Sequence, residues 1–134
     1  MSDYKQSVVA NFGLKVIEFQ LGDLKLKEGE ELPEEYAGKS IYIRKMAGKE
    51  FENFAVENQG IRNDDGSLNG EKFRGTRARF VTVCQTDPEG NALWDDADEC
   101  NASLANEALG IIFAACQQVN GVGAKAAEVA EKNS

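Results

Sequence analysis

The chain has 134 residues, of which 42% are apolar and 28% charged, and its formal net charge is -8 at pH 7. A chain of this length folds as one domain and buries about two thirds of its unfolded surface, and its composition excludes a disordered or fibrous protein. The negative charge disfavours nucleic acid as a partner, because affinity for phosphate backbones depends on Lys and Arg displacing counterions.

Residues that perform common catalytic chemistry are scarce. There is no histidine, which excludes Ser-His-Asp and Cys-His mechanisms and removes the commonest metal ligand. A paired-carboxylate hydrolase would need aromatic platforms for its substrate, and aromatic residues make up only 8% of the chain. Neither glycine pattern of the phosphate-binding loops occurs. We therefore expect no enzymatic activity, no cofactor and no metal.

The cysteines and two acidic loops point to structure rather than to binding. Cys84, Cys100 and Cys116 lack the Cys-x-x-Cys spacing of zinc or redox sites, and we interpret them as reduced, buried, small hydrophobic residues. The segments 64–71 and 87–91 superficially resemble calcium loops, but neither places its oxygen ligands, Gly and Glu at the required positions. We interpret both as turns.

Nothing in the sequence predicts a membrane protein. No apolar run approaches the roughly 20 residues of a membrane-spanning helix. The first residues lack the charged-then-apolar plan of a signal peptide, so we expect a cytoplasmic protein.

The first third of the sequence predicts short strands. Residues 1–13 are polar without sustained periodicity, and we expect them to be flexible. Apolar and polar residues alternate over 14–26 with a break at Gly22, which is typical of two short strands or one bent strand. An acidic loop follows at 28–39. The β-branched and aromatic residues of 40–45 predict a strand that pairs back on the first.

Helices are expected further along the chain. Apolar spacing predicts a helix over 48–58, and the composition of 60–70 predicts a loop. A second helix is expected over 73–86, because an apolar stripe recurs there and Pro88 ends it. The stripe consists of Phe73, Arg77, Phe80, Val81 and Cys84.

The C-terminal part predicts a turn and a last strong helix. The turn at 88–91 is followed by Leu93 and Trp94, and the helix runs from 103 to 119 with Gly121 as its stop. Residues 124–134 are expected to form a marginal tail helix. The sequence therefore predicts a single α+β domain over 1–134, with short N-terminal antiparallel β-strands followed by a small packed set of α-helices.

Charge is distributed unevenly along the chain. Acidic residues without a basic one extend from Asp87 to Glu107, and a basic cluster precedes them, which consists of Lys72, Arg74, Arg77 and Arg79. These segments either form a solvated surface whose charges pair loosely within the fold or include a docking patch.

Two side chains on the predicted helices raise the same choice between structure and binding. Arg77 lies on an apolar stripe, where an unpaired charge is costly, so it either pairs with Asp87 or Asp98 or contacts a partner. Phe113 lies at the fringe of the last helix's apolar face. It is either peripheral core or, if exposed beside Leu109, part of a partner site.

Several short segments follow one another in a recognisable order after residue 40. A strand ends in Ile-Tyr-Ile-Arg-Lys-Met, Ala-Gly-Lys-Glu opens the next helix, and Arg-Ala-Arg-Phe-Val lies in the one after it. Then come Asp-Pro-Glu-Gly-Asn-Ala-Leu-Trp-Asp, Gln-Val-Asn-Gly-Val and a final Glu-Lys-Asn-Ser. This series resembles the tail assembly chaperones of long-tailed, siphovirus-type bacteriophages. Ala47 departs from the family's capping Ser or Thr, and Trp94 from its commoner Phe.

The resemblance implies a protein that binds the long, largely helical tape measure protein in the host cytoplasm and keeps it soluble. It also implies recruitment of the major tail protein, absence from the mature virion, and a longer product made by ribosomal frameshifting near Lys132 and Asn133. Self-association is compatible with this role. As candidates for partner contact we select residues on or between the helices at 73–86 and 103–119, namely Arg77, Leu93, Trp94, Leu109 and Phe113.

Two other classes of protein remain open. A minor structural tail or head-tail joining protein would be retained in the virion in stoichiometric amount. An acidic regulator that mimics nucleic acid would spread its carboxylates over one face, whereas most of them here lie in one stretch and one loop.

Overall fold

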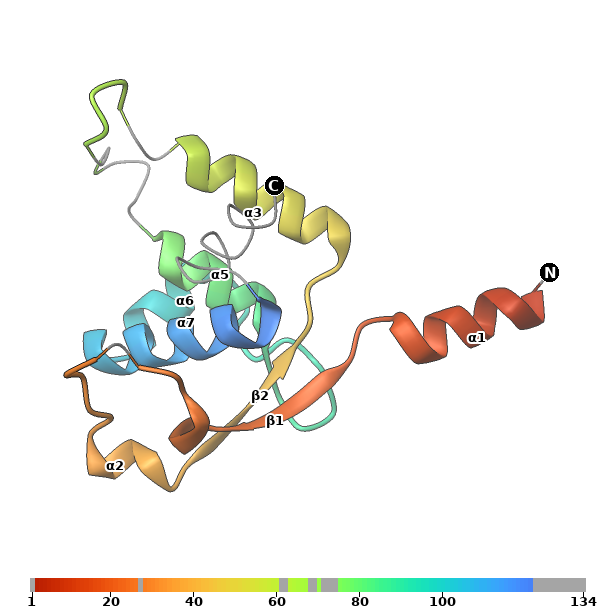
Figure 1. Ribbon diagram of the computed structural model, residues 1–134, viewed down its shortest axis with the longest axis horizontal. Helices are drawn as coiled ribbons and strands as arrows, with labels where there is room; N and C mark the ends of the chain where they lie inside the picture. Colours follow the sequence, from red (N-terminus) through yellow and green to blue (C-terminus); the bar gives the residue numbers. More distant parts are fainter. Residues whose placement is uncertain (1, 27, 61–62, 68–69, 71–74, 122–134) are drawn as a thin grey trace.

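Three short strands form an antiparallel sheet in the computed structural model of the chain (Figure 1). The strand β1 (Val16–Gln20) pairs with β2 (Ser40–Arg44), which pairs on its other side with β3 (Gln85–Thr86). The strand predicted at 40–45 and its pairing with the first strand are thus confirmed. The structure describes residues 2–26, 28–60, 63–67, 70 and 75–121.

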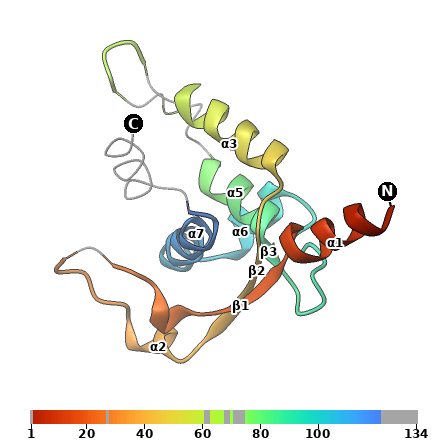
Figure 2. The same ribbon diagram turned by 45° about the vertical axis from the view of Figure 1, so that its right-hand side comes forward.

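A group of helices packs on one face of this sheet (Figure 2). The helix α5 (Thr76–Cys84) lies against both α6 (Ala97–Ser103) and α7 (Asn106–Asn120), and α3 (Gly48–Gly60) lies over α5. The core between sheet and helices includes Ile43, Phe80, Val81, Leu109, Ile112 and the three cysteines. The predicted α+β class is therefore confirmed, with short antiparallel strands followed by packed helices.

The N-terminal segment differs from the prediction of a flexible stretch. Residues Ser2–Phe12 form the helix α1, which projects away from the body of the molecule (Figure 1). The prediction was wrong because Tyr4, Val8 and Phe12 recur at every fourth position, one face of a helix, although polar residues outnumber them.

The segment 14–26, predicted as two short strands or one bent strand, contains the single strand β1. After β1 the chain turns through a short 3₁₀ helix, η1 (Leu21–Asp23), and Leu24 to Leu26 are not in a strand. The acidic loop contains a single helical turn, α2 (Glu34–Ala37), directly after Pro33. Proline is favoured at the start of a helix because it has no N–H to leave unpaired.

The helix predicted at 48–58 is confirmed as α3, and the loop predicted at 60–70 contains a turn over 63–67. The helix predicted at 73–86 is confirmed only over α5, because Gln85 and Thr86 belong to the sheet. Phe73 and the tail helix predicted at 124–134 lie outside the described residues.

The helix predicted from 103 to 119 is confirmed as α7, which begins at Asn106, and a separate helix that was not predicted, α6, precedes it. Asp96 caps α6 by accepting a hydrogen bond from the Glu99 N–H at 2.8 Å, and Leu104 and Ala105 are extended before α7 begins. The acidic residues Asp98 and Glu99 therefore occupy the first turn of a helix, where negative charge is favourable. Gly121 ends α7 in the left-handed conformation at φ 68°, as predicted.

Candidate functional site

The five residues selected for partner contact do not form one exposed patch. Leu109 is only 2% exposed and belongs to the core, so its placement on a surface edge is wrong. Phe113 packs edge-on against Phe80 with 5.4 Å between ring centroids, which agrees with peripheral core. Trp94 is half-buried and donates from Nε1 to Gln85 Oε1 at 2.9 Å, whereas Leu93 is exposed.

Arg77 forms a hydrogen bond with an amide instead of an ion pair with a carboxylate of the acidic stretch. Its Nη2 donates to Asn106 Oδ1 at 2.7 Å, and its guanidinium lies beside Gly110 on the same helix, so the expected pairing with Asp87 or Asp98 is wrong. The physical reason is that α5 buries Thr76 and Ala78 instead, which leaves Arg77 half-exposed along the side of α7.

The acidic loop 87–91 is a turn, as predicted, and so is the described part of the other loop, residues 63–67. Asp87 Oδ1 accepts hydrogen bonds from the N–H groups of Glu89 and Asn91, each at 2.9 Å, and the bond from Asn91 is the main cause of the lowered pKa of Asp87. Asp65 accepts from the hydroxyl and the N–H of Ser67, which lowers the pKa of Asp65 in the same way. These carboxylates are engaged by their own loops.

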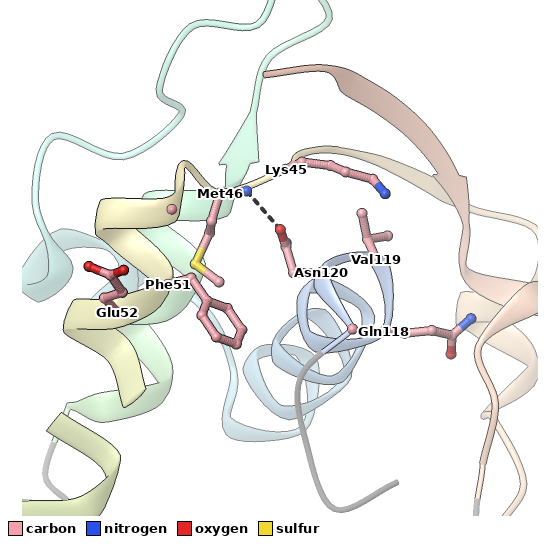
Figure 3. A pocket seen from close by; sticks show the side chains of 9 residues that line it. Lys45, Met46, Phe51, Glu52, Gln118, Val119 and Asn120 are labelled. Carbon is pink, nitrogen blue, oxygen red and sulfur yellow. Dashed lines mark hydrogen bonds between the residues drawn. The ribbon is translucent and has the colours of Figure 1, made fainter. Parts of the chain in front are cut away.

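A first groove lies between the start of α3 and the end of α7, and we call it the α3–α7 groove (Figure 3). It has a volume of about 520 Å³. Figure 3 shows the Met46 and Phe51 side chains next to one another on the α3 side, with Asn120 and Val119 on the α7 side opposite. Its lining residues are Lys45, Met46, Gly48, Phe51, Glu52, Gln118, Val119, Asn120 and Gly121.

Asn120 holds the two sides of the α3–α7 groove together. Its Oδ1 accepts a hydrogen bond from the Met46 N–H at 2.7 Å, across 74 positions of sequence (Figure 3). Its Nδ2 donates to the Cys116 carbonyl at 3.0 Å. Asn120 could not be identified as a linking residue from the sequence, because its hydrogen-bond partner is distant in the chain.

Glu50 fixes the start of α3. It accepts the Ala47 N–H at 2.8 Å and forms a bidentate ion pair with Arg44, whose Nη1 lies 2.9 Å from Oε1. The Arg44 guanidinium is the main cause of the lowered pKa of Glu50. Glu50 thus supplies half of a capping box and compensates for the absence of Ser or Thr at position 47. The spacing Ala-x-x-Glu could have revealed this role.

A second groove lies on the other side of α3, and we call it the α3–α5 groove. It has a volume of about 460 Å³. Phe54 and Phe80 form its floor, with ring centroids 4.4 Å apart, and α6 closes one end through Ala97. Its lining residues are Met46, Glu50, Asn53, Phe54, Arg79, Phe80, Thr82, Val83 and Ala97. Its apolar floor and charged rim suit an amphipathic helix better than a small polar ligand.

The three cysteines are buried, as expected, and are not bonded to one another as disulfides. The hydrogen bond between the Cys116 and Cys84 side chains, together with burial, raises the pKa of Cys116 well above its usual range. Burial also raises the pKa of Cys100. Thiols in this state are protonated and react slowly with electrophiles.

Across the described ranges, no group of three His, Cys, Asp or Glu side chains is placed to bind a metal ion. The described helices likewise include none that is both long and apolar enough to cross a membrane. Comparisons of the chain with protein-family models, with curated proteins and with solved structures found no match.

Proposed function

We propose that this chain is a tail assembly chaperone of a long-tailed bacteriophage, which binds the tape measure protein in the host cytoplasm and keeps it soluble. The observation that carries the proposal is that segments quoted for the resemblance contact one another. Asn120, of the Gln-Val-Asn-Gly-Val segment, binds Met46, which ends the Ile-Tyr-Ile-Arg-Lys-Met segment, and Glu50 closes the start of α3. Segments that share contacts as well as order favour a common fold over a chance match of short motifs.

The α3–α5 groove offers a surface for a helical client. Helix-in-groove recognition places the apolar face of an amphipathic helix, with anchors about one turn apart, against an apolar floor. Phe54, Phe80 and Val83 supply such a floor, and Asn53 and Arg79 lie at its rim. α3 has 13 residues and is therefore about 20 Å long, which matches three to four turns of a client helix. The occupant we propose is an apolar stripe of the tape measure protein.

The rest of the chain favours solubility of such a complex. The net charge of -8 makes complexes repel one another. Much of the negative charge lies around α6 and the start of α7, where Asp95, Asp96 and Asp98 are exposed. Recruitment of the major tail protein, absence from the mature virion and a frameshifted longer product belong to the proposal through the resemblance alone.

A pair of variants on α3 tests where the client binds. Asn53 lines the α3–α5 groove and is exposed, so Asn53→Arg fills the groove without disturbing the core. Val56 lies one turn further along and is 69% exposed outside both grooves, so Val56→Arg is the matched control. We expect Asn53→Arg to weaken binding of the purified tape measure protein by at least about tenfold, or about 1.4 kcal/mol, and Val56→Arg to leave it unchanged.

Equal binding by both variants would place the client elsewhere on the surface. The alternative, a structural tail or head-tail joining protein, predicts no binding by the unaltered chain and a stoichiometric amount of it in purified virions.

A further inference from the structure

The helix α1 is unpartnered in the structure. Residues 3–12 are all exposed, so nothing in the described part of the chain buries this helix. A helix of 11 residues is marginal in water by itself, because nucleation costs more than so few hydrogen bonds return. Its sequence includes Val8, Val9 and Asn11, which are weak helix formers. A stable α1 therefore requires a surface that the described residues of its own chain do not supply.

One side of α1 is apolar. Tyr4, Val8 and Phe12 recur at i, i+4 and i+8, and Val9 widens the stripe. Tyr4 is 79% and Phe12 is 82% exposed, which is unusual for two aromatic side chains on one short helix. We call this set of four residues the α1 stripe.

The α3–α7 groove has the chemistry to receive the α1 stripe. Its centre is apolar through Met46, Phe51 and Val119, and Phe51 is 44% exposed there (Figure 3). Its rim carries one basic and one acidic residue, Lys45 and Glu52.

Charge does not oppose the docking of α1 in this groove overall. Over Ser2–Phe12, α1 carries one acidic and one basic residue, Asp3 and Lys5, whose charges cancel, as do those of Lys45 and Glu52 at the rim. The acidic residues 95–107 lie at the other end of α7, about 20 Å from the groove along a helix of 15 residues.

The path of the chain directs α1 away from its own groove. The Gly13 N–H donates to the Val9 carbonyl at 2.8 Å, which continues the helical pattern to the junction with β1. A Cβ at Gly13 would lie 2.4 Å from that carbonyl oxygen, so only glycine allows this close approach. The Lys45 N–H donates to the Lys15 carbonyl at 2.9 Å, which places the base of α1 beside the rim of the groove.

We infer that this chain forms a two-fold dimer in which each copy inserts its α1 stripe into the α3–α7 groove of the other. An arm that leaves from the rim of one groove is well placed to enter a neighbour's groove while the neighbour's arm enters the first. The α1 stripe exposes about 450 Å². Two arms in two grooves therefore remove up to about 900 Å² of arm surface from water over both copies, twice as much as a single junction, and the groove surface that they cover adds to this area.

The oligomeric state of the purified full chain tests the inference, independently of any phage protein. Light scattering after size exclusion is expected to give twice the 14.6 kDa mass of one chain. Phe12→Ser on the arm and Phe51→Ser in the groove should each raise the dissociation constant at least about tenfold. The matched controls, Gln6→Ser on the polar side of α1 and Val56→Ser on α3, should leave it unchanged. Circular dichroism verifies that each variant is folded.

Mixing the two defective variants distinguishes exchange of arms from other dimers. In the mixed pair, the intact arm of the Phe51→Ser chain meets the intact groove of the Phe12→Ser chain, so the mixture should associate more tightly than either variant alone. A monomeric unaltered chain at millimolar concentration would overturn the inference. So would a Phe51→Ser variant that dimerises as tightly as the unaltered chain, because the α1 stripe would then have a different occupant.

Discussion

Replacement of Asn120 by Ala is expected to destabilise the protein more than its position near the end of a helix suggests. The Asn120 side chain is the acceptor for the Met46 N–H at 2.7 Å and a donor to the Cys116 and Arg44 carbonyls at 3.0 and 3.4 Å. Ala removes these three bonds and a fourth, from Asn120 Nδ2 to Cys84 Sγ at 3.6 Å. The Met46 N–H lies between the sheet and α3, is part-buried, and loses its acceptor in this variant.

The magnitude follows from that unsatisfied donor. Leaving a half-buried backbone N–H without an acceptor costs about 2 kcal/mol in free energy of unfolding, more than the net value of an average hydrogen bond. Gln118 provides the comparison, because its Oε1 accepts the Lys25 N–H at 2.7 Å and its Nε2 donates to the Asp23 carbonyl at 3.1 Å. Those groups are exposed, so water replaces Gln118 in a Gln118→Ala variant, which should lose only about 0.5 kcal/mol.

Urea denaturation of the two variants and the unaltered chain, followed by tryptophan fluorescence and circular dichroism, measures both losses. The slope of the free energy against urea should be unchanged, so that the shift in midpoint reports stability alone. Equal losses for Asn120→Ala and Gln118→Ala would refute the reasoning, because burial of the Met46 N–H would then contribute nothing.

Three further substitutions test other local contacts. Glu50→Gln should cost about 1 kcal/mol at neutral pH. Because the pKa of Glu50 is depressed in the fold, the difference from the unaltered chain in acid-denaturation titrations should shrink as the pH falls below 4.5 and vanish below the depressed pKa. Trp94→Phe should lower the free energy of unfolding by about 1 to 2 kcal/mol in urea denaturation, because Gln85 is buried and its Oε1 loses its donor. Adding Gln85→Leu to the Trp94→Phe chain should recover part of this loss, because no unpaired acceptor then remains. Gly121→Ala should lower the thermal midpoint by an amount equivalent to about 1 kcal/mol through backbone strain at φ 68°, whereas Gly48→Ala, where the space is open and φ is not positive, should not.

Local patterns predicted the elements whose environment is simple. β2 is the β-branched and aromatic run Ser-Ile-Tyr-Ile-Arg with Ile43 buried, and α3 begins and ends where its apolar spacing and glycines indicate. The fold class followed from these elements. α6 was missed although its signature is present, because Asp96 and Glu99 were interpreted as surface charge rather than as the first turn of a helix.

The features that could not be predicted depend on contacts between segments that are distant in the sequence. Leu109 is buried because α7 packs against both α5 and the sheet, so its buried face is wider than the single stripe that periodicity selects. Arg77 donates a hydrogen bond to Asn106, 29 positions away, rather than to a carboxylate. The neighbouring residues of α5 face the core, which places Arg77 beside α7. Neither groove was predicted, since each is lined by segments far apart in the sequence, such as Met46 and Asn120.

Coexpression with the tape measure protein of the same phage tests the proposed function most directly. The fraction of the tape measure protein that stays soluble is compared with and without this chain, and the soluble fraction is examined for a complex of the two. The proposal predicts that the tape measure protein becomes soluble and co-purifies with this chain, which is then absent from mature virions. An insoluble tape measure protein, with this chain present in intact virions, would contradict the proposal and identify a structural component.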